Sequence, residues 1–72
     1  MKLEEELNKL GIKHRVEMFN GSKFIECENG VRVNIYKDHI TISDHTTLYS
    51  FPPRENSLDF ILKVIKDNEP NK

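Results

Sequence analysis

Residues 12–27, with the sequence IKHRVEMFNGSKFIEC, decide the fold of this chain. Apolar and polar side chains alternate along the first half of this stretch, which is the period of a half-buried β-strand. Asn20-Gly21 follows, and this dipeptide favours a two-residue type I′ turn because both of its residues tolerate positive φ. Pairing the strands across the turn sets Val16 opposite Ile25. The stretch therefore predicts a β-hairpin with its apolar side chains on one face.

The charged residues of the hairpin support the same register. They set Arg15 opposite Glu26 and Lys13 opposite Glu28, and cross-strand pairs of opposite charge stabilise a sheet. A slip of one residue would move every side chain to the other face. The apolar and charged faces would then no longer be separate, so we expect the register without a slip.

A second turn lies at residues 28–30, and two loop lengths are compatible with it. A two-residue loop would set Glu26 beside Val33 and mix the two faces. A three-residue loop, with Gly30 in the left-handed region and a bulge beside it, sets Ile25 opposite Val33 instead. We expect the three-residue loop because it alone keeps one apolar face.

The third and fourth strands are predicted over residues 31–36 and 39–43. Lys37-Asp38 forms the turn between them, and the resulting register sets Ile35 opposite Ile40. Lysine is poorly suited to the positive φ of a tight hairpin turn, so a longer loop remains an alternative here.

A fifth strand is predicted over residues 47–51, which are rich in β-branched and aromatic side chains. Its register stays open. Leu48 faces inward in one register, whereas Tyr49 and Phe51 face inward in the other. Pro52-Pro53 ends the strand because proline cannot donate a ladder hydrogen bond.

A helix is predicted at each end of the chain. The first covers about residues 2–10, where leucines recur at helical spacing and Gly11 follows as a terminator. The second covers about residues 57–68, and its apolar stripe consists of Leu58, Ile61, Leu62 and Ile65. We expect residues 1–68 to form a single domain and residues 69–72 to be a frayed tail.

These elements predict an α+β fold, in which an antiparallel four- to five-stranded β-meander is flanked by an N-terminal and a C-terminal α-helix. The apolar face of the sheet is expected to comprise Val16, Met18, Ile25, Cys27, Val31, Val33, Ile35, Ile40 and Ile42. The apolar stripes of two short helices can cover only one face. The other face is therefore expected to be open to solvent or to a partner.

The composition disfavours several classes of protein. With 11 basic and 12 acidic residues, the chain lacks the excess positive charge of most dedicated nucleic-acid binders. An acidic N-terminus and the lack of an apolar run of about 20 residues predict a cytoplasmic protein without a membrane span. Lys, Asn and Ile are frequent, and their AT-rich codons indicate a low-GC bacterium, or a phage or mobile element within one.

The sequence offers no convincing catalytic or metal site. Cys27 is the single cysteine, so the chain has neither an internal disulfide nor a CxxC metal motif. His14 is predicted opposite Cys27, but this pair would lie under the helices without a third group to orient it. It supplies two metal ligands at most, whereas zinc needs three or four. We therefore expect no catalytic residue, no metal and no cofactor.

The open face is predicted to carry a binding site near one end of the sheet, formed by Phe19, Phe24, Tyr36, His39, Arg15 and Arg32. Three explanations fit this cluster. The C-terminal segment could cover Phe19 or Phe24, the cluster could bind a protein partner or a second copy, or its rings could stack on single-stranded nucleic acid. We expect a small non-enzymatic binding protein that acts through a protein partner or as a homodimer. Single-stranded nucleic-acid binding is the alternative.

Overall fold

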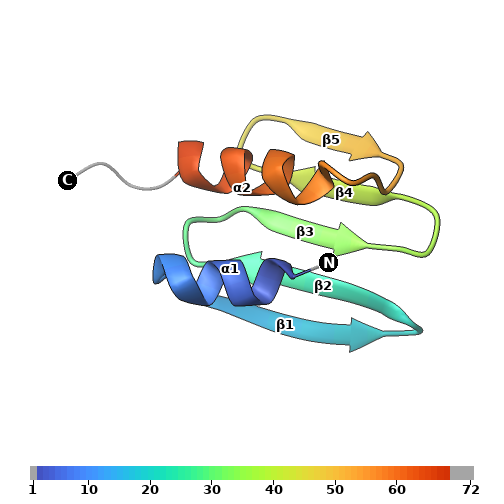
Figure 1. Cartoon of the computed structure of the whole chain (residues 1–72), viewed down its shortest axis with the longest axis horizontal. Coiled ribbons are helices and arrows are strands. Elements are labelled where there is room, and N and C mark those ends of the chain that lie inside the picture. Colours follow the sequence, from blue (N-terminus) through green and yellow to red (C-terminus); the bar gives the residue numbers. More distant parts are fainter. Residues whose placement is uncertain (1, 69–72) are drawn as a thin grey trace.

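The computed structural model of the protein describes residues 2–68. Its elements, in chain order, are α1 (Leu3–Leu10), β1 (His14–Phe19), β2 (Ser22–Cys27), β3 (Arg32–Ile35), β4 (Ile40–Ser43), β5 (Leu48–Phe51) and α2 (Ser57–Asp67). The five strands form one antiparallel sheet in the order of the chain (Figure 1). This arrangement confirms the predicted α+β meander with a helix at each end. The predicted frayed tail, residues 69–72, lies outside the described residues.

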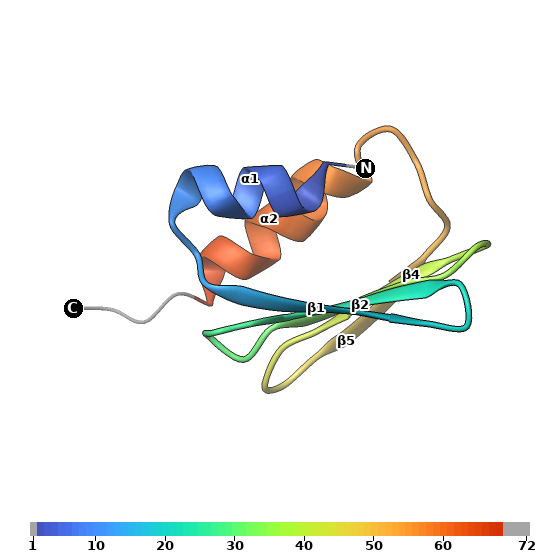
Figure 2. The ribbon, with the colours of Figure 1, turned by 90° about the horizontal axis from the view of Figure 1, so that it is seen from below.

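Both helices lie on the same face of the sheet, and within residues 2–68 no helix lies over the opposite face (Figure 2). Helix α1 lies over the β1–β2 side of the sheet and α2 over the β4–β5 side (Figure 1). Lys23 of β2 donates a hydrogen bond of 2.7 Å to Glu4 of α1, and this bond lowers the pKa of the Glu4 carboxyl. No helix within residues 2–68 is long and apolar enough to cross a membrane.

The first hairpin has the predicted turn and register. Asn20 and Gly21 have φ values of 51° and 82°, as a type I′ turn requires. Val16 pairs with Ile25 in the resulting ladder. The apolar alternation and the turn dipeptide therefore agree, and together they determine how β1 and β2 pair.

The second hairpin has the predicted three-residue loop. Gly30 lies at φ 96°, and its N–H donates to the carbonyl of Cys27 at 3.0 Å. Beyond the loop, the N–H of Cys27 donates to the carbonyl of Val31 at 2.8 Å. Ile25 and Val33 are consequently opposite each other, which keeps one apolar face across β2 and β3.

The third hairpin has a two-residue loop and not the longer alternative. The N–H of Tyr36 donates to the carbonyl of His39 at 2.9 Å, so only Lys37 and Asp38 lie between them. Asn20 is the only non-glycine residue with positive φ in the described chain, so the turn does not force Lys37 into the left-handed region.

The fifth strand exists, and its register is now determined. Tyr49 pairs with Ile42 and Phe51 with Ile40, so both aromatic side chains share the face of the helices. Each packs edge-to-face on Phe60 of α2, with ring centroids 5.3 and 5.4 Å apart. Leu48 points to the open face.

The core lies between the sheet and the two helices. Its fully buried side chains come from both helices and from strands β2 to β4 with the adjoining loop: Leu3, Leu7, Ile25, Val31, Val33, Ile40, Ile42, Ile61 and Ile65. Met18 lies on the predicted face, in register with Lys23, but its side chain is 65% exposed and takes no part in the core. Met18 lies on the edge strand near the hairpin tip, which extends beyond the helices (Figure 2).

Candidate binding surface

The aromatic surface, which we define as Phe19, Phe24, Tyr36 and His39, lies at one end of the open face. The ladder places Phe24 next to Glu17 on one side and Asn34 on the other. Phe19, Phe24 and Tyr36 line a shared shallow hollow of about 500 Å³. The structure thus brings together the three aromatic rings that the strand register had placed on this face.

The members of the aromatic surface differ in exposure. Phe19 is 74% exposed and Tyr36 is 37% exposed, whereas Phe24 and His39 are half-buried. The C-terminal segment does not cover Phe19, because the aromatic side chains of that segment pack against α2 on the other face. The explanation that Phe19 is hidden by this segment is therefore wrong for residues 2–68.

Tyr36 and His39 form a stacked pair across the third turn. Their ring centroids are 4.4 Å apart and their planes differ by 17°. His39 also donates from Nδ1 to Asp38 at 2.7 Å, and this hydrogen bond holds the pKa of the Asp38 carboxyl below its ordinary value. The stack and the hydrogen bond restrain both rings, so this edge of the surface is pre-organised.

Arg15 and Arg32, the other predicted site residues, lie one row beyond Phe24, and both contact Glu26. Arg15 donates to one carboxylate oxygen of Glu26, and Arg32 lies 3.5 Å from the other. Arg15 is also 3.9 Å from Glu17. The two positive charges on this part of the open face are therefore matched by two negative charges.

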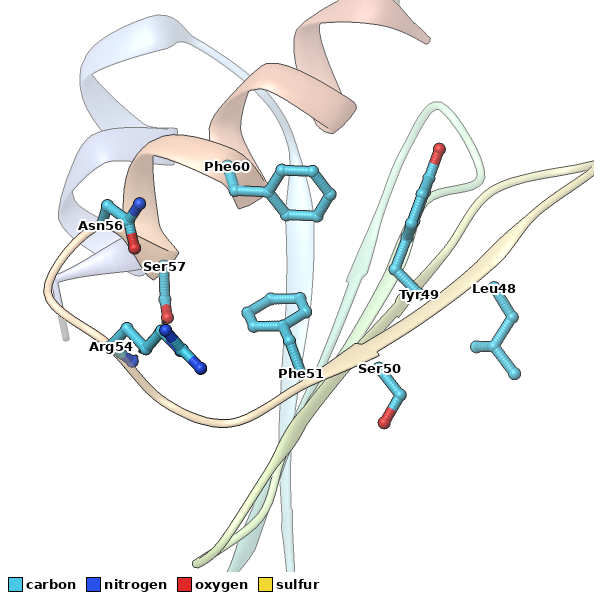
Figure 3. Close-up of a pocket in the computed structure, with 8 residues that line it drawn as sticks. All are labelled: Leu48, Tyr49, Ser50, Phe51, Arg54, Asn56, Ser57 and Phe60. Carbon is cyan, nitrogen blue, oxygen red and sulfur yellow. Dashed lines mark hydrogen bonds between the residues drawn. The ribbon is translucent and has the colours of Figure 1, made fainter.

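A second hollow, which the sequence interpretation missed, lies between β5 and the start of α2 (Figure 3). It has a volume of about 510 Å³, and Tyr49, Phe51, Phe60 and Arg54 contribute to its lining. The sequence contained part of the signal, because Phe60 lies beside the main apolar stripe of the second helix. The hollow could not be located while the register of β5 stayed open.

His14 and Cys27 are paired across β1 and β2, as predicted. Cys27 is only 3% exposed, and burial raises the pKa of its thiol to about 11. The thiol is therefore protonated at neutral pH, unlike an activated nucleophile. His14 Nδ1 lies 2.9 Å from the carbonyl of Ile12. Within residues 2–68, no three His, Cys, Asp or Glu side chains are grouped to hold a metal.

No protein-family model, curated protein or solved structure matches the chain. Function must therefore be inferred from the chain's own surfaces.

Proposed function

We propose that this chain is a small non-enzymatic accessory protein of the cytoplasm that binds another protein through the aromatic surface. The proposal is carried by the 74% exposure of Phe19, on a sheet face without a helix over it. Aromatic and arginine side chains dominate the binding energy of many protein interfaces. The frequent Lys, Asn and Ile noted above fit a phage or mobile-element origin, in which case the partner would be a host protein.

The charge of the open face favours a protein over a nucleic acid as the ligand. Nucleic-acid binding draws most of its affinity from Lys and Arg side chains that neutralise phosphates. Here Arg15 and Arg32 both contact Glu26, and Glu17 lies within the same part of the face. Counting these four side chains, a phosphate backbone would meet no net positive charge on this part of the face, whereas a protein interface tolerates such a balanced rim.

Site-specific photo-crosslinking tests the proposal in cells of the native host. A photoreactive phenylalanine analogue at Phe19 should give a discrete adduct with one protein, and Tyr36→Asp should remove that adduct. The same analogue at Met18 is the matched control. Met18 is the preceding residue, its side chain is 65% exposed, and it points to the opposite face. An adduct joining two copies of this chain would identify a second copy as the partner.

Equal crosslinking from both positions, or none from position 19, would contradict the proposal. Single-stranded nucleic-acid binding would be supported instead by affinity for a labelled oligonucleotide that falls steeply with salt and is lost in Phe24→Ala. We expect no such binding even at low salt.

A further inference from the structure

Strand β5 forms one of the two edges of the sheet. Alternate residues along it direct their backbone N–H and C=O groups away from β4, where they have no partner strand within residues 2–68. The N–H of Asp44 donates to the carbonyl of Thr47 at 3.0 Å. Because hydrogen-bonded pairs alternate along an antiparallel ladder, Tyr49 and Phe51 then bond to β4. Leu48 and Ser50 must therefore direct their N–H and C=O groups outward, toward any strand that lies beside β5.

The two edges are protected to different degrees. Natural edge strands discourage pairing with another chain by carrying charged residues. Strand β1 contains Arg15 and Glu17, whereas β5, with the sequence LYSF, contains no charged residue. The β5 edge is thus the one that lacks this protection.

Apolar side chains are exposed on both faces of the β5 edge. Leu48 is 70% exposed on the open face, although it is a large aliphatic residue. On the helix face, Tyr49, Phe51 and Phe60 line the hollow of about 510 Å³, which opens beside this strand (Figure 3). A strand placed along β5 would bury these side chains as well as pair the outward backbone groups.

We propose that the occupant of this edge is a second copy of the chain, with the two β5 strands paired antiparallel about a two-fold axis at Tyr49. In this register Leu48 of each copy is opposite Ser50 of the other, so both residues use their outward N–H and C=O groups. A register shifted toward Pro52 would lose a hydrogen bond because proline has no N–H. The axis at Tyr49 therefore uses the available groups most fully.

A second copy suits this edge for reasons of charge and symmetry. A strand without charge can pair with itself without placing like charges opposite each other. Phe60, the fourth residue of α2, contacts Tyr49, so the axis passes near the start of α2 and the two copies of α2 run antiparallel. A two-fold contact also closes on itself, whereas pairing β5 with β1 would build an open-ended fibre.

Sedimentation velocity over a range of protein concentrations tests the proposal. The native chain should form a dimer, and Ser50→Pro should raise the dissociation constant at least about tenfold, because the outward N–H of each copy is lost. That substitution removes no hydrogen bond to β4, and proline is tolerated on an edge strand. Met18→Pro is the matched control. It removes an outward N–H from the β1 edge, so the dimer should persist.

Two further measurements cover the case in which Ser50→Pro fails to fold. Leu48→Lys adds a charge to the exposed side of β5, and it should also give a folded monomer by circular dichroism and sedimentation. In the native chain, amide exchange at Leu48 and Ser50 should slow with rising concentration, while exchange at Val16 and Met18 should not. A native chain that stays monomeric at millimolar concentration would overturn the proposal, as would a dimer unaffected by Leu48→Lys.

Discussion

At the scale of single residues, burial of Cys27 couples the stability of the protein to alkaline pH. The thiol has a pKa of about 11 in the folded chain, against an ordinary value of 9.0. The folded state keeps its proton where the unfolded chain has lost it. Stability from this group is therefore complete below pH 9 and is lost as the pH rises toward 11.

This coupling predicts a difference between the native chain and Cys27→Val, which keeps an apolar side chain but cannot titrate. Between pH 9 and 11, the free energy of unfolding should fall more steeply for the native chain than for the variant. Urea denaturation at several pH values measures both slopes, and the variant accounts for the titration of Tyr and Lys in the same range. Equal slopes would show that the thiol is not differentially protonated.

Gly30 provides a second prediction at this scale. Its φ of 96° disfavours any side chain, and an added Cβ would lie 2.7 Å from Cε1 of His45. Since His45 is exposed, its ring can move aside, and the main penalty is backbone strain. Gly30→Ala should lower the free energy of unfolding by about 1–2 kcal/mol. Gly30→Asn should lower it less, because asparagine tolerates this region better.

A double-mutant cycle separates the two contributions in Gly30→Ala. If backbone strain dominates, the substitution should have the same effect in a His45→Ala background, with a coupling below about 0.5 kcal/mol. Recovery of most of the lost stability by His45→Ala would instead place the penalty in the steric contact.

At the scale of elements, Asn29 joins the second hairpin loop to the C-terminal end of α2. Its Nδ2 donates to the carbonyl of Ile65 at 2.9 Å, and its Oδ1 accepts from the N–H of Val31 at 3.2 Å. The same carbonyl also accepts the N–H of Asn68 at 3.2 Å, so the side chain of Asn29 adds a second donor to a carbonyl in the last turn of the helix. The loop thereby fixes one end of α2 over the sheet.

We expect Asn29→Ala to lower the free energy of unfolding by about 1–2 kcal/mol, measured in urea. Asn29→Asp keeps an acceptor for Val31 but removes the donor and places negative charge at the helix C-terminus. It should therefore be less stable than Asn29→Ala at pH 7, and should regain stability as the carboxyl is protonated. An aspartate variant as stable as the native chain would contradict this account of the loop.

Strands β1 to β4 could be predicted from sequence because the first two turns contain asparagine and glycine at suitable positions, and because across Lys37-Asp38 the expected register keeps the two faces separate. The fifth strand could not, since Leu48 and the pair Tyr49 and Phe51 are alternative apolar sets. Contacts with Phe60, on the helix that follows the strand, favour the second set. The exposure of Met18 was equally unpredictable, because strand periodicity does not reveal how far a helix extends.

At the scale of the whole molecule, the fold has one covered face and one open face. The residues predicted for the binding site do lie on the open face. Their placement could be predicted because strand register alone determines which face a side chain occupies. Register could not reveal that Arg15 and Arg32 share Glu26, since this depends on side-chain conformation. Nor could it reveal the hollow beside β5, which requires the position of α2.

The proposed function requires that the aromatic surface lies outside the core, and the free energy of unfolding of Phe19→Asp tests this directly. Phe19 is 74% exposed and Ile25 is fully buried, so Ile25→Asp is the matched control. We predict that Phe19→Asp changes the free energy of unfolding in urea by no more than about 0.5 kcal/mol, whereas Ile25→Asp abolishes cooperative folding. A Phe19→Asp variant that unfolds would show that this ring belongs to the core and would contradict the assignment of the open face.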